Sequence, residues 1–187
     1  MKKLFAQMLL LLLFSSLCLA QSNSSSQSSA PSNRAEAEKA IRSVLYEMSV
    51  ATQTGDAKIF RKHAAQRTLK FYDLLAEELL KNSNLKEQFN RAGVTNGESF
   101  IEFSFRGIAQ RVAATPRPKI EELARGYAAS PLTFVSQTEA KVETNSGTIR
   151  IIWEADEWKV DSTDETKKVL LGRLPLSAES KTKLEKF

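Results

Sequence analysis

Residues 133–162 read TFVSQTEAKVETNSGTIRIIWEADEWKVDS, and this stretch decides the fold of the chain. It predicts three short antiparallel strands joined by two tight turns. The first turn falls at residues 145–147 (Asn-Ser-Gly) and the second at residues 155–157 (Ala-Asp-Glu), and both are flanked by β-branched and aromatic residues.

The predicted strands have one apolar face. Successive side chains of a strand point to opposite faces, so Ile149, Ile151 and Trp153 share a face of the middle strand, and Trp158 and Val160 share a face of the last strand. A sheet of three strands is not stable without a cover on such a face. We therefore expect the segments before residue 133 to pack against it.

Those earlier segments have helical periodicity. Residues 34–54 place their apolar side chains on one side, and Gly55 is suited to the left-handed position that ends a helix. Residues 56–80 continue the helical pattern, with a predicted interruption at Arg67 and Thr68. Residues 99–105 alternate as a strand would, but their apolar side chains also continue at helical spacing through residue 112, which favours a helix.

The fold class predicted from this order is α+β, with N-terminal amphipathic helices packed on a C-terminal antiparallel meander in a cone-like arrangement. Residues 34–187 form a single domain, in which the meander covers about 133–163 and residues 164–187 are a C-terminal extension. Residues 21–33 contain seven serines in thirteen positions and no large apolar side chain, so they predict a disordered linker.

Residues 1–20 have the pattern of a signal peptide: a basic start, an unbroken apolar run at residues 8–14, and small residues before a cleavage point after Ala20. Cleavage would remove Cys18, the only cysteine, and would lower the net charge from +5 to +3 because residues 1–20 carry two lysines and no acid. We expect an exported protein, periplasmic or secreted, with no membrane span after cleavage and no nucleic-acid partner.

The chain has few side chains that could catalyse a reaction or bind a metal or cofactor. His63 is the only histidine, and we interpret it as an ordinary surface or half-buried helix residue because no second histidine or cysteine accompanies it. No glycine-rich phosphate loop is present, so we expect no nucleotide cofactor. Because the sequence also has no catalytic or metal-binding motif, we expect no catalytic residues, no metal and no other cofactor. The enzymatic alternative is an acid such as Asp73 acting beside a tyrosine, and it requires that carboxylate to point into a pocket.

Aromatic side chains are numerous enough to form an apolar binding pocket. The candidates are Tyr46, Phe71, Phe103, Trp153 and Trp158. A packed core is the competing interpretation, because binding pockets and cores are both apolar.

The element order resembles that of small exported bacterial members of the nuclear-transport-factor-2-like superfamily. The resemblance rests on Gly55-Asp56 at the end of the first helix and on residues 142–161, which close with Trp158-Lys159-Val160-Asp161. It implies a cone-shaped α+β domain that is frequently dimeric. No catalytic residue of the superfamily's enzymes has a match here.

Three functions remain open from the sequence. The first is a non-enzymatic exported domain that binds a small apolar ligand, a lipid or an envelope protein. The second is a structural or interaction module without a ligand, in which a homodimer is one arrangement. The third is an isomerase- or dehydratase-like enzyme.

Overall fold

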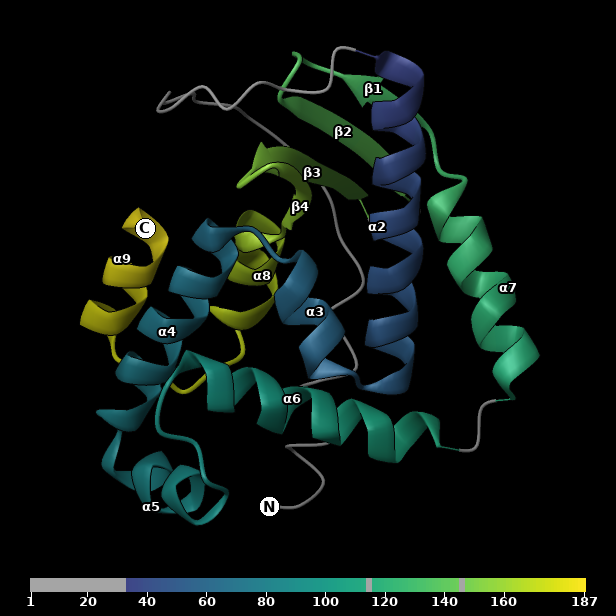
Figure 1. Cartoon of the computed structure of the whole chain (residues 1–187). Helices are drawn as coiled ribbons and strands as arrows, with labels where there is room; N and C mark the ends of the chain where they lie inside the picture. The colour runs from purple at the N-terminus through teal and green to yellow at the C-terminus, as the bar shows by residue number, and fades with distance from the viewer. Residues whose placement is uncertain (1–32, 114–115, 145–146) are drawn as a thin grey trace.

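The computed structural model describes residues 33–113, 116–144 and 147–187, so the expectations for residues 1–32 lie outside the described residues. Helices precede an antiparallel sheet, and two further helices follow it (Figure 1). The helices are α2 (Arg34–Thr54), α3 (Ala57–His63), α4 (Gln66–Leu80), α5 (Ser83–Arg91), α6 (Gly97–Val112), α7 (Arg117–Ala128), α8 (Thr163–Leu170) and α9 (Ala178–Lys186). The strands are β1 (Leu132–Phe134), β2 (Glu139–Thr144), β3 (Gly147–Glu154) and β4 (Glu157–Asp161).

The predicted α+β class is confirmed, with helices first and an antiparallel sheet on the C-terminal side. The prediction of three strands was wrong, because β1 pairs with β2 and gives the sheet the order β1-β2-β3-β4. A strand of three residues is too short to show a clear alternation in the sequence. The predicted helix at residues 99–105 is confirmed as part of α6.

Strand register places the apolar side chains on one face, as alternation predicts. Ile151 lies opposite Val160 on one side and Ala140 on the other, and Trp153 lies opposite Trp158. The helix α2 crosses this region in front of the strands (Figure 1). Ile151 is fully buried, as is Ile41 of α2, so the sheet and the first described helix share one core.

Helix boundaries follow local hydrogen bonds. Asn33 caps α2 by accepting from the backbone N–H of Ala35, and Gly55 ends it at φ 75°. The break in the next helical stretch falls at Ala64 and Ala65 rather than at the predicted Arg67 and Thr68. Here the backbone N–H of Ala65 donates to the carbonyl oxygen of Val160 at 2.9 Å, so the segment between α3 and α4 is held at the edge of β4.

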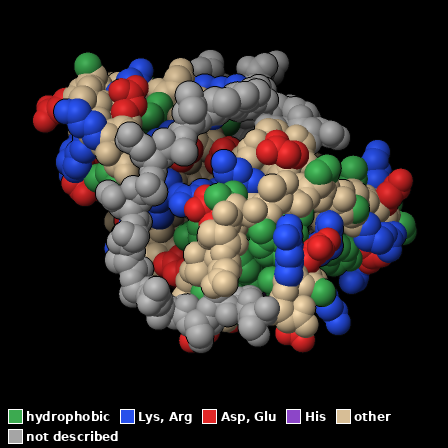
Figure 2. Space-filling view, turned by 90° about the horizontal axis from the view of Figure 1, so that it is seen from above, with side chains coloured by type: hydrophobic (Ala, Val, Ile, Leu, Met, Phe, Trp, Pro, Cys, Tyr) green, Lys and Arg blue, Asp and Glu red, His purple; other side chains and the backbone are tan. Residues whose placement is uncertain are grey.

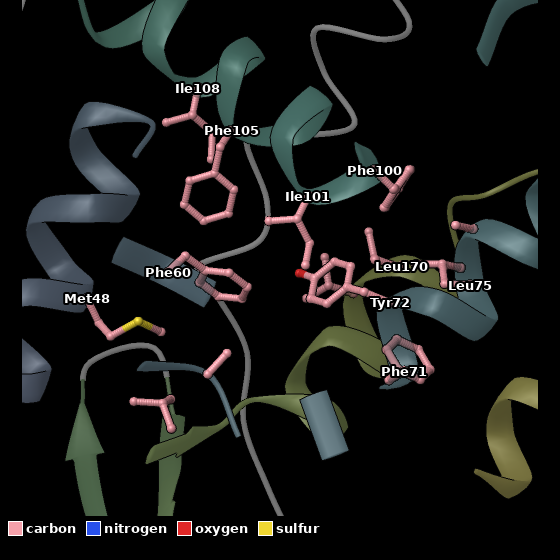
Figure 3. Close-up of a cluster of buried hydrophobic side chains, with 14 of the residues drawn as sticks. Met48, Phe60, Phe71, Tyr72, Leu75, Phe100, Ile101, Phe105, Ile108 and Leu170 are labelled. Atoms are coloured by element: carbon pink, nitrogen blue, oxygen red, sulfur yellow. The ribbon is translucent and has the colours of Figure 1, made fainter. Parts of the chain in front are cut away.

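A second part of the core lies among the helices. Aromatic rings from α3, α4 and α6 meet there, with Met48 of α2 at one side and Leu170 of α8 among them (Figure 3). The ring centroids of Phe60 and Phe105 are 4.9 Å apart, and those of Phe60 and Tyr72 are 5.9 Å apart with the rings nearly perpendicular. Such edge-to-face contacts are favourable beyond the area that they bury.

The carboxylate of Asp161 is buried at the junction of β4, α4 and α8. It is only 3% exposed, and it accepts from the backbone N–H of Thr163 at 3.1 Å and from the Thr163 hydroxyl at 2.7 Å. Thr68 and Arg67 of α4 donate to it at 3.3 and 3.2 Å, and Arg150 of β3 lies 3.4 Å away. Burial alone would raise the pKa of Asp161, but the hydrogen bonds from Thr163 and the charge of Arg67 lower it below its ordinary value.

The C-terminal helix α9 is attached to α4 through another buried acid. Glu78 is 4% exposed and accepts from Ser180 at 2.7 Å, from Lys183 at 2.8 Å and from Lys81 at 2.8 Å. Burial opposes ionisation, yet the donors outweigh it and lower the pKa of Glu78 to about 2. The C-terminal extension is therefore fixed to the domain by specific polar contacts.

Candidate functional site

The site with the strongest signal for a ligand is an aromatic cluster at the β3–β4 hairpin, formed by Trp153, Trp158 and Phe134. Trp153 and Trp158 are direct cross-strand neighbours with ring centroids 5.4 Å apart and planes at 70°. Phe134 of β1 lies 6.2 Å from Trp158, also edge to face. The three rings belong to the same sheet face because β1 to β4 are in register.

The hairpin geometry fixes this pair. Ala155 and Asp156 form a two-residue turn in which both residues have positive φ, 52° and 60°. Such turns match the twist of the flanking strands and set their register. Glu154 and Glu157 are therefore opposite each other, and the two tryptophans form the next pair along.

Both indole N–H groups in this cluster lack a partner. Among the side-chain nitrogen and oxygen atoms that are buried in the described part of the chain, only Nε1 of Trp153 and Nε1 of Trp158 have no hydrogen-bond partner. Trp158 is 2% exposed, so water does not cover it. Buried donors of this kind are rare in folded proteins, and an unsatisfied one costs about 1–3 kcal/mol.

A cation also lies against Phe134. The guanidinium carbon of Arg34, the first residue of α2, lies 4.8 Å from the centroid of the Phe134 ring. This is the distance of a cation–π contact. In the view from above, hydrophobic side chains reach the surface in the middle of the molecule, and basic and acidic side chains lie to either side of them (Figure 2).

The structure brings two of the five predicted pocket residues together and separates the other three. Trp153 and Trp158 are paired, whereas Phe71 is fully buried in the helical core beside Tyr72 and Phe187. Phe103 of α6 is half-buried against Phe89 of α5, with centroids 5.8 Å apart.

Tyr46 is half-buried on α2, two residues from both Val44 and Met48. Tyr46 lies on the same side of α2 as the buried Ser49, three residues further on, and among the described residues no ring contact with Trp153 or Trp158 places it in the cluster.

Asp73 does not meet the condition of the enzymatic alternative. Its side chain is exposed, and its carboxylate accepts from the backbone N–H of Gly97 at the start of α6 at 3.0 Å. The acid with a raised pKa is Glu165 of α8, and burial is the main cause of the rise. Glu165 also acts electrostatically on Tyr127, whose pKa burial raises to about 12. Sequence reasoning missed this pair because its members are on α7 and α8, and all four strands lie between these two helices in the sequence.

His63 differs from its predicted surface or half-buried position. It is 5% exposed, and its Nε2 lies 2.8 Å from Oε2 of Glu47 on α2. The hydrogen bond to His63 lowers the pKa of Glu47, although partial burial opposes this. Within the described ranges, no three histidine, cysteine or acidic side chains come together in a way that could hold a metal ion.

No family model matches this chain, and neither a curated protein nor a solved structure matches it. Among the helices that the structure describes, none has the length and apolar character needed to cross a membrane.

Proposed function

We propose that this chain is an exported binding domain without catalytic activity, and that it holds a small, largely apolar molecule against Trp153 and Trp158. The observation that carries the proposal is the pair of buried indole N–H groups without partners. A ligand with a hydrogen-bond acceptor would satisfy donors that the protein itself leaves unpaired. The resemblance to the nuclear-transport-factor-2-like superfamily, whose members include many pocketed domains, is compatible with this role.

The chemistry of the cluster favours an amphipathic ligand. Phe134, Trp153 and Trp158 offer ring faces and edges, and binding sites commonly combine such surfaces with a few polar groups that orient the ligand. A purely apolar molecule would leave the indole N–H groups as costly as before. A lipid or another small molecule with one polar end fits both features.

Native mass spectrometry tests the proposal most directly. The full chain would be expressed with residues 1–20 and purified gently from the cell envelope. We expect a chain that begins at Gln21 and carries a reproducible extra mass, which disappears on denaturation. A chain that still begins at Met1 would contradict export, and a bare mass in every preparation would favour the interaction module. The same spectrum distinguishes a monomer from a homodimer.

Tryptophan fluorescence locates the bound molecule, because Trp153 and Trp158 are the only two tryptophans. In each of the variants Trp153→Phe and Trp158→Phe, the remaining indole reports binding of the molecule found by mass spectrometry. Each exchange keeps an aromatic ring and removes one donor, so we expect roughly tenfold weaker binding. Phe103→Leu on α6, whose ring packs on Phe89, is the control and should bind normally.

The enzymatic alternative now depends on Glu165 and Tyr127 rather than on Asp73, because Glu165 is the acid whose pKa is raised. An acid with a raised pKa near a phenol is the kind of pair that an isomerase- or dehydratase-like reaction uses as a proton donor. Carbon-13 NMR titration of the Glu165 carboxyl in wild type and in Tyr127→Phe tests the coupling. An ordinary glutamate titration that is unchanged in the variant would exclude this pair as a catalytic unit.

A further inference from the structure

Asn96 and Gly97 form the only Asn-Gly pair in the sequence. In such a pair the backbone nitrogen of the glycine can attack the side-chain amide of the asparagine, because glycine has no side chain to hinder the approach. The nitrogen loses its proton and forms a bond to Cγ, and the side-chain amide leaves as ammonia. Water then opens the five-membered succinimide ring, which leaves aspartate or isoaspartate in place of Asn96.

The packing of α6 on α4 depends on both residues. Asn96 is the N-cap of α6: its side chain accepts from the backbone N–H of Ser99 at 2.9 Å, and its own backbone N–H donates to the Ser99 hydroxyl at 3.0 Å. Gly97 lies directly against α4, because a Cβ atom there would be 2.4 Å from the backbone nitrogen of Asp73. A residue without a side chain therefore has to follow the cap, and the reactive pair results.

The folded structure blocks the reaction at the attacking nitrogen. The backbone N–H of Gly97 donates to Oδ1 of Asp73 at 3.0 Å. The carboxylate holds this proton, and its negative charge opposes the deprotonation that the attack requires. Gly97 is also buried, although Asn96 is exposed. The contact between α4 and α6 therefore covers the nucleophile and leaves the amide accessible.

The backbone conformation of Asn96 is a second obstacle to the reaction. A nearly planar five-membered ring needs Cβ of Asn96 and the nitrogen of Gly97 to be almost eclipsed about the Cα–C bond. Asn96 has an extended backbone, with φ −157° and ψ −177°, in which these two atoms are staggered. Ring closure therefore requires rotation of the peptide unit, and this rotation breaks the hydrogen bond from Gly97 to Asp73.

We propose that Asn96 is a latent site of deamidation, which Asp73 keeps closed in the folded protein and which opens whenever the first turn of α6 separates from α4. Native proteins undergo such local openings without unfolding globally. The isoaspartate product lengthens the backbone by a methylene group, so the capping box of α6 would no longer fit. This modification site is independent of any ligand and goes beyond the proposed function.

Peptide mapping by mass spectrometry measures the reaction, because deamidation changes the mass of the peptide that contains Asn96. The purified protein would be incubated at slightly alkaline pH, either folded or in urea. We expect deamidation of Asn96 to be at least about tenfold slower in the folded protein than in urea. In the variant Asn96→Ser, which keeps a capping oxygen and lacks the amide, the mass change should disappear from this peptide.

The variant Asp73→Ala removes the acceptor of the Gly97 N–H. It should accelerate deamidation of the folded protein about tenfold and leave the rate in urea unchanged. Asp73→Asn keeps an uncharged acceptor, so its rate should fall between those of wild type and Asp73→Ala. Lys70→Ala, at an exposed position three residues earlier on α4, is the matched control and should change the rate less than about twofold.

Hydrogen exchange of the Gly97 N–H and thermal melts followed by circular dichroism separate local opening from global unfolding. A folded rate equal to the rate in urea would overturn the proposal, since the structure would then give no protection. An unchanged rate in Asp73→Ala would also overturn it. Equal acceleration by Asp73→Ala and Lys70→Ala would do the same, because a general loss of stability would then be the cause. Ligand binding at the tryptophans is tested separately by native mass spectrometry.

Discussion

At the scale of single residues, the turn between β3 and β4 carries avoidable strain. Ala155 and Asp156 both adopt positive φ, a region that residues other than glycine, asparagine and aspartate rarely occupy, so the strain falls mainly on Ala155. The double variant Ala155→Asn with Asp156→Gly supplies the residues preferred in this turn. We expect it to raise the free energy of unfolding by about 1 kcal/mol in urea denaturation.

The control for that exchange is Asp164→Gly in the first turn of α8, where the glycine has no positive φ to relieve. It should lower stability, because it removes one of the two acids paired with Arg67 and places glycine in a helix. A loss of stability in the turn variant would show that the native side chains at the turn make contacts that outweigh the strain.

Asp161 is the residue whose ionisation matters most to packing at the sheet edge. Asp161→Asn keeps the shape and removes the charge that receives hydrogen bonds from Thr163 and Arg67. We expect a loss of about 2–3 kcal/mol in the free energy of unfolding at neutral pH. Asp156→Asn, an exposed acid in the same hairpin, is the control and should change stability little. An equal effect of the two exchanges would contradict a special role for Asp161.

At the scale of elements, the junction of α2 and α6 depends on the absence of a side chain at Gly55. A Cβ atom there would lie 2.5 Å from the carbonyl oxygen of Phe105, and φ is 75° as well. We expect Gly55→Ala to cost about 2–5 kcal/mol, since steric overlap adds to the backbone strain. The measurement is the thermal unfolding midpoint together with urea denaturation.

Two other glycines distinguish the cost of steric overlap from the cost of backbone strain. Gly93 has φ 79°, but a Cβ atom there would meet no other atom within 4 Å, so Gly93→Ala should cost only the backbone part, about 1–2 kcal/mol. Gly126 lies inside α7 with no such neighbour, and Gly126→Ala should stabilise the helix by about 1 kcal/mol. Equal costs for Gly55→Ala and Gly93→Ala would show that α6 moves away without penalty.

The elements also show how much of the fold can be predicted from the sequence. Alternation correctly placed Trp153 and Trp158 on one face, and helical spacing correctly identified α6. Burial of Asp161 could not be predicted, because its donors Arg67 and Thr68 come from a helix far away in the chain. The same limit applies to the site, since the contact of Arg34 with Phe134 arises only when α2 crosses the sheet.

At the scale of the whole molecule, acid should unfold the domain through two buried carboxylates. The folded-state pKa values of Asp161 and Glu78 lie below their ordinary values of 3.8 and 4.5. The stability that each contributes is therefore fully present above its ordinary pKa and is lost as the pH falls through the folded-state pKa, which for Glu78 is about 2.

The measurement is the urea midpoint as a function of pH between about 5 and 2, in wild type and in Glu78→Gln. We expect wild type to lose stability steadily across this window and the variant to show a shallower slope. Glu122→Gln, at an exposed position on α7, is the control. Parallel slopes for wild type and Glu78→Gln would contradict the role of Glu78 in holding α9 on α4.

The hydrogen bond from Ala65 to Val160 has a consequence for how the chain matures during synthesis. The segment around Ala65, which bonds to the edge of β4, leaves the ribosome long before β4 does. At ordinary elongation rates, this interval is on the order of ten seconds. During that time the aromatic helices cannot close on their sheet. For the exported protein that we propose, a nascent chain without its sheet is a suitable substrate for a channel that threads unfolded polypeptide.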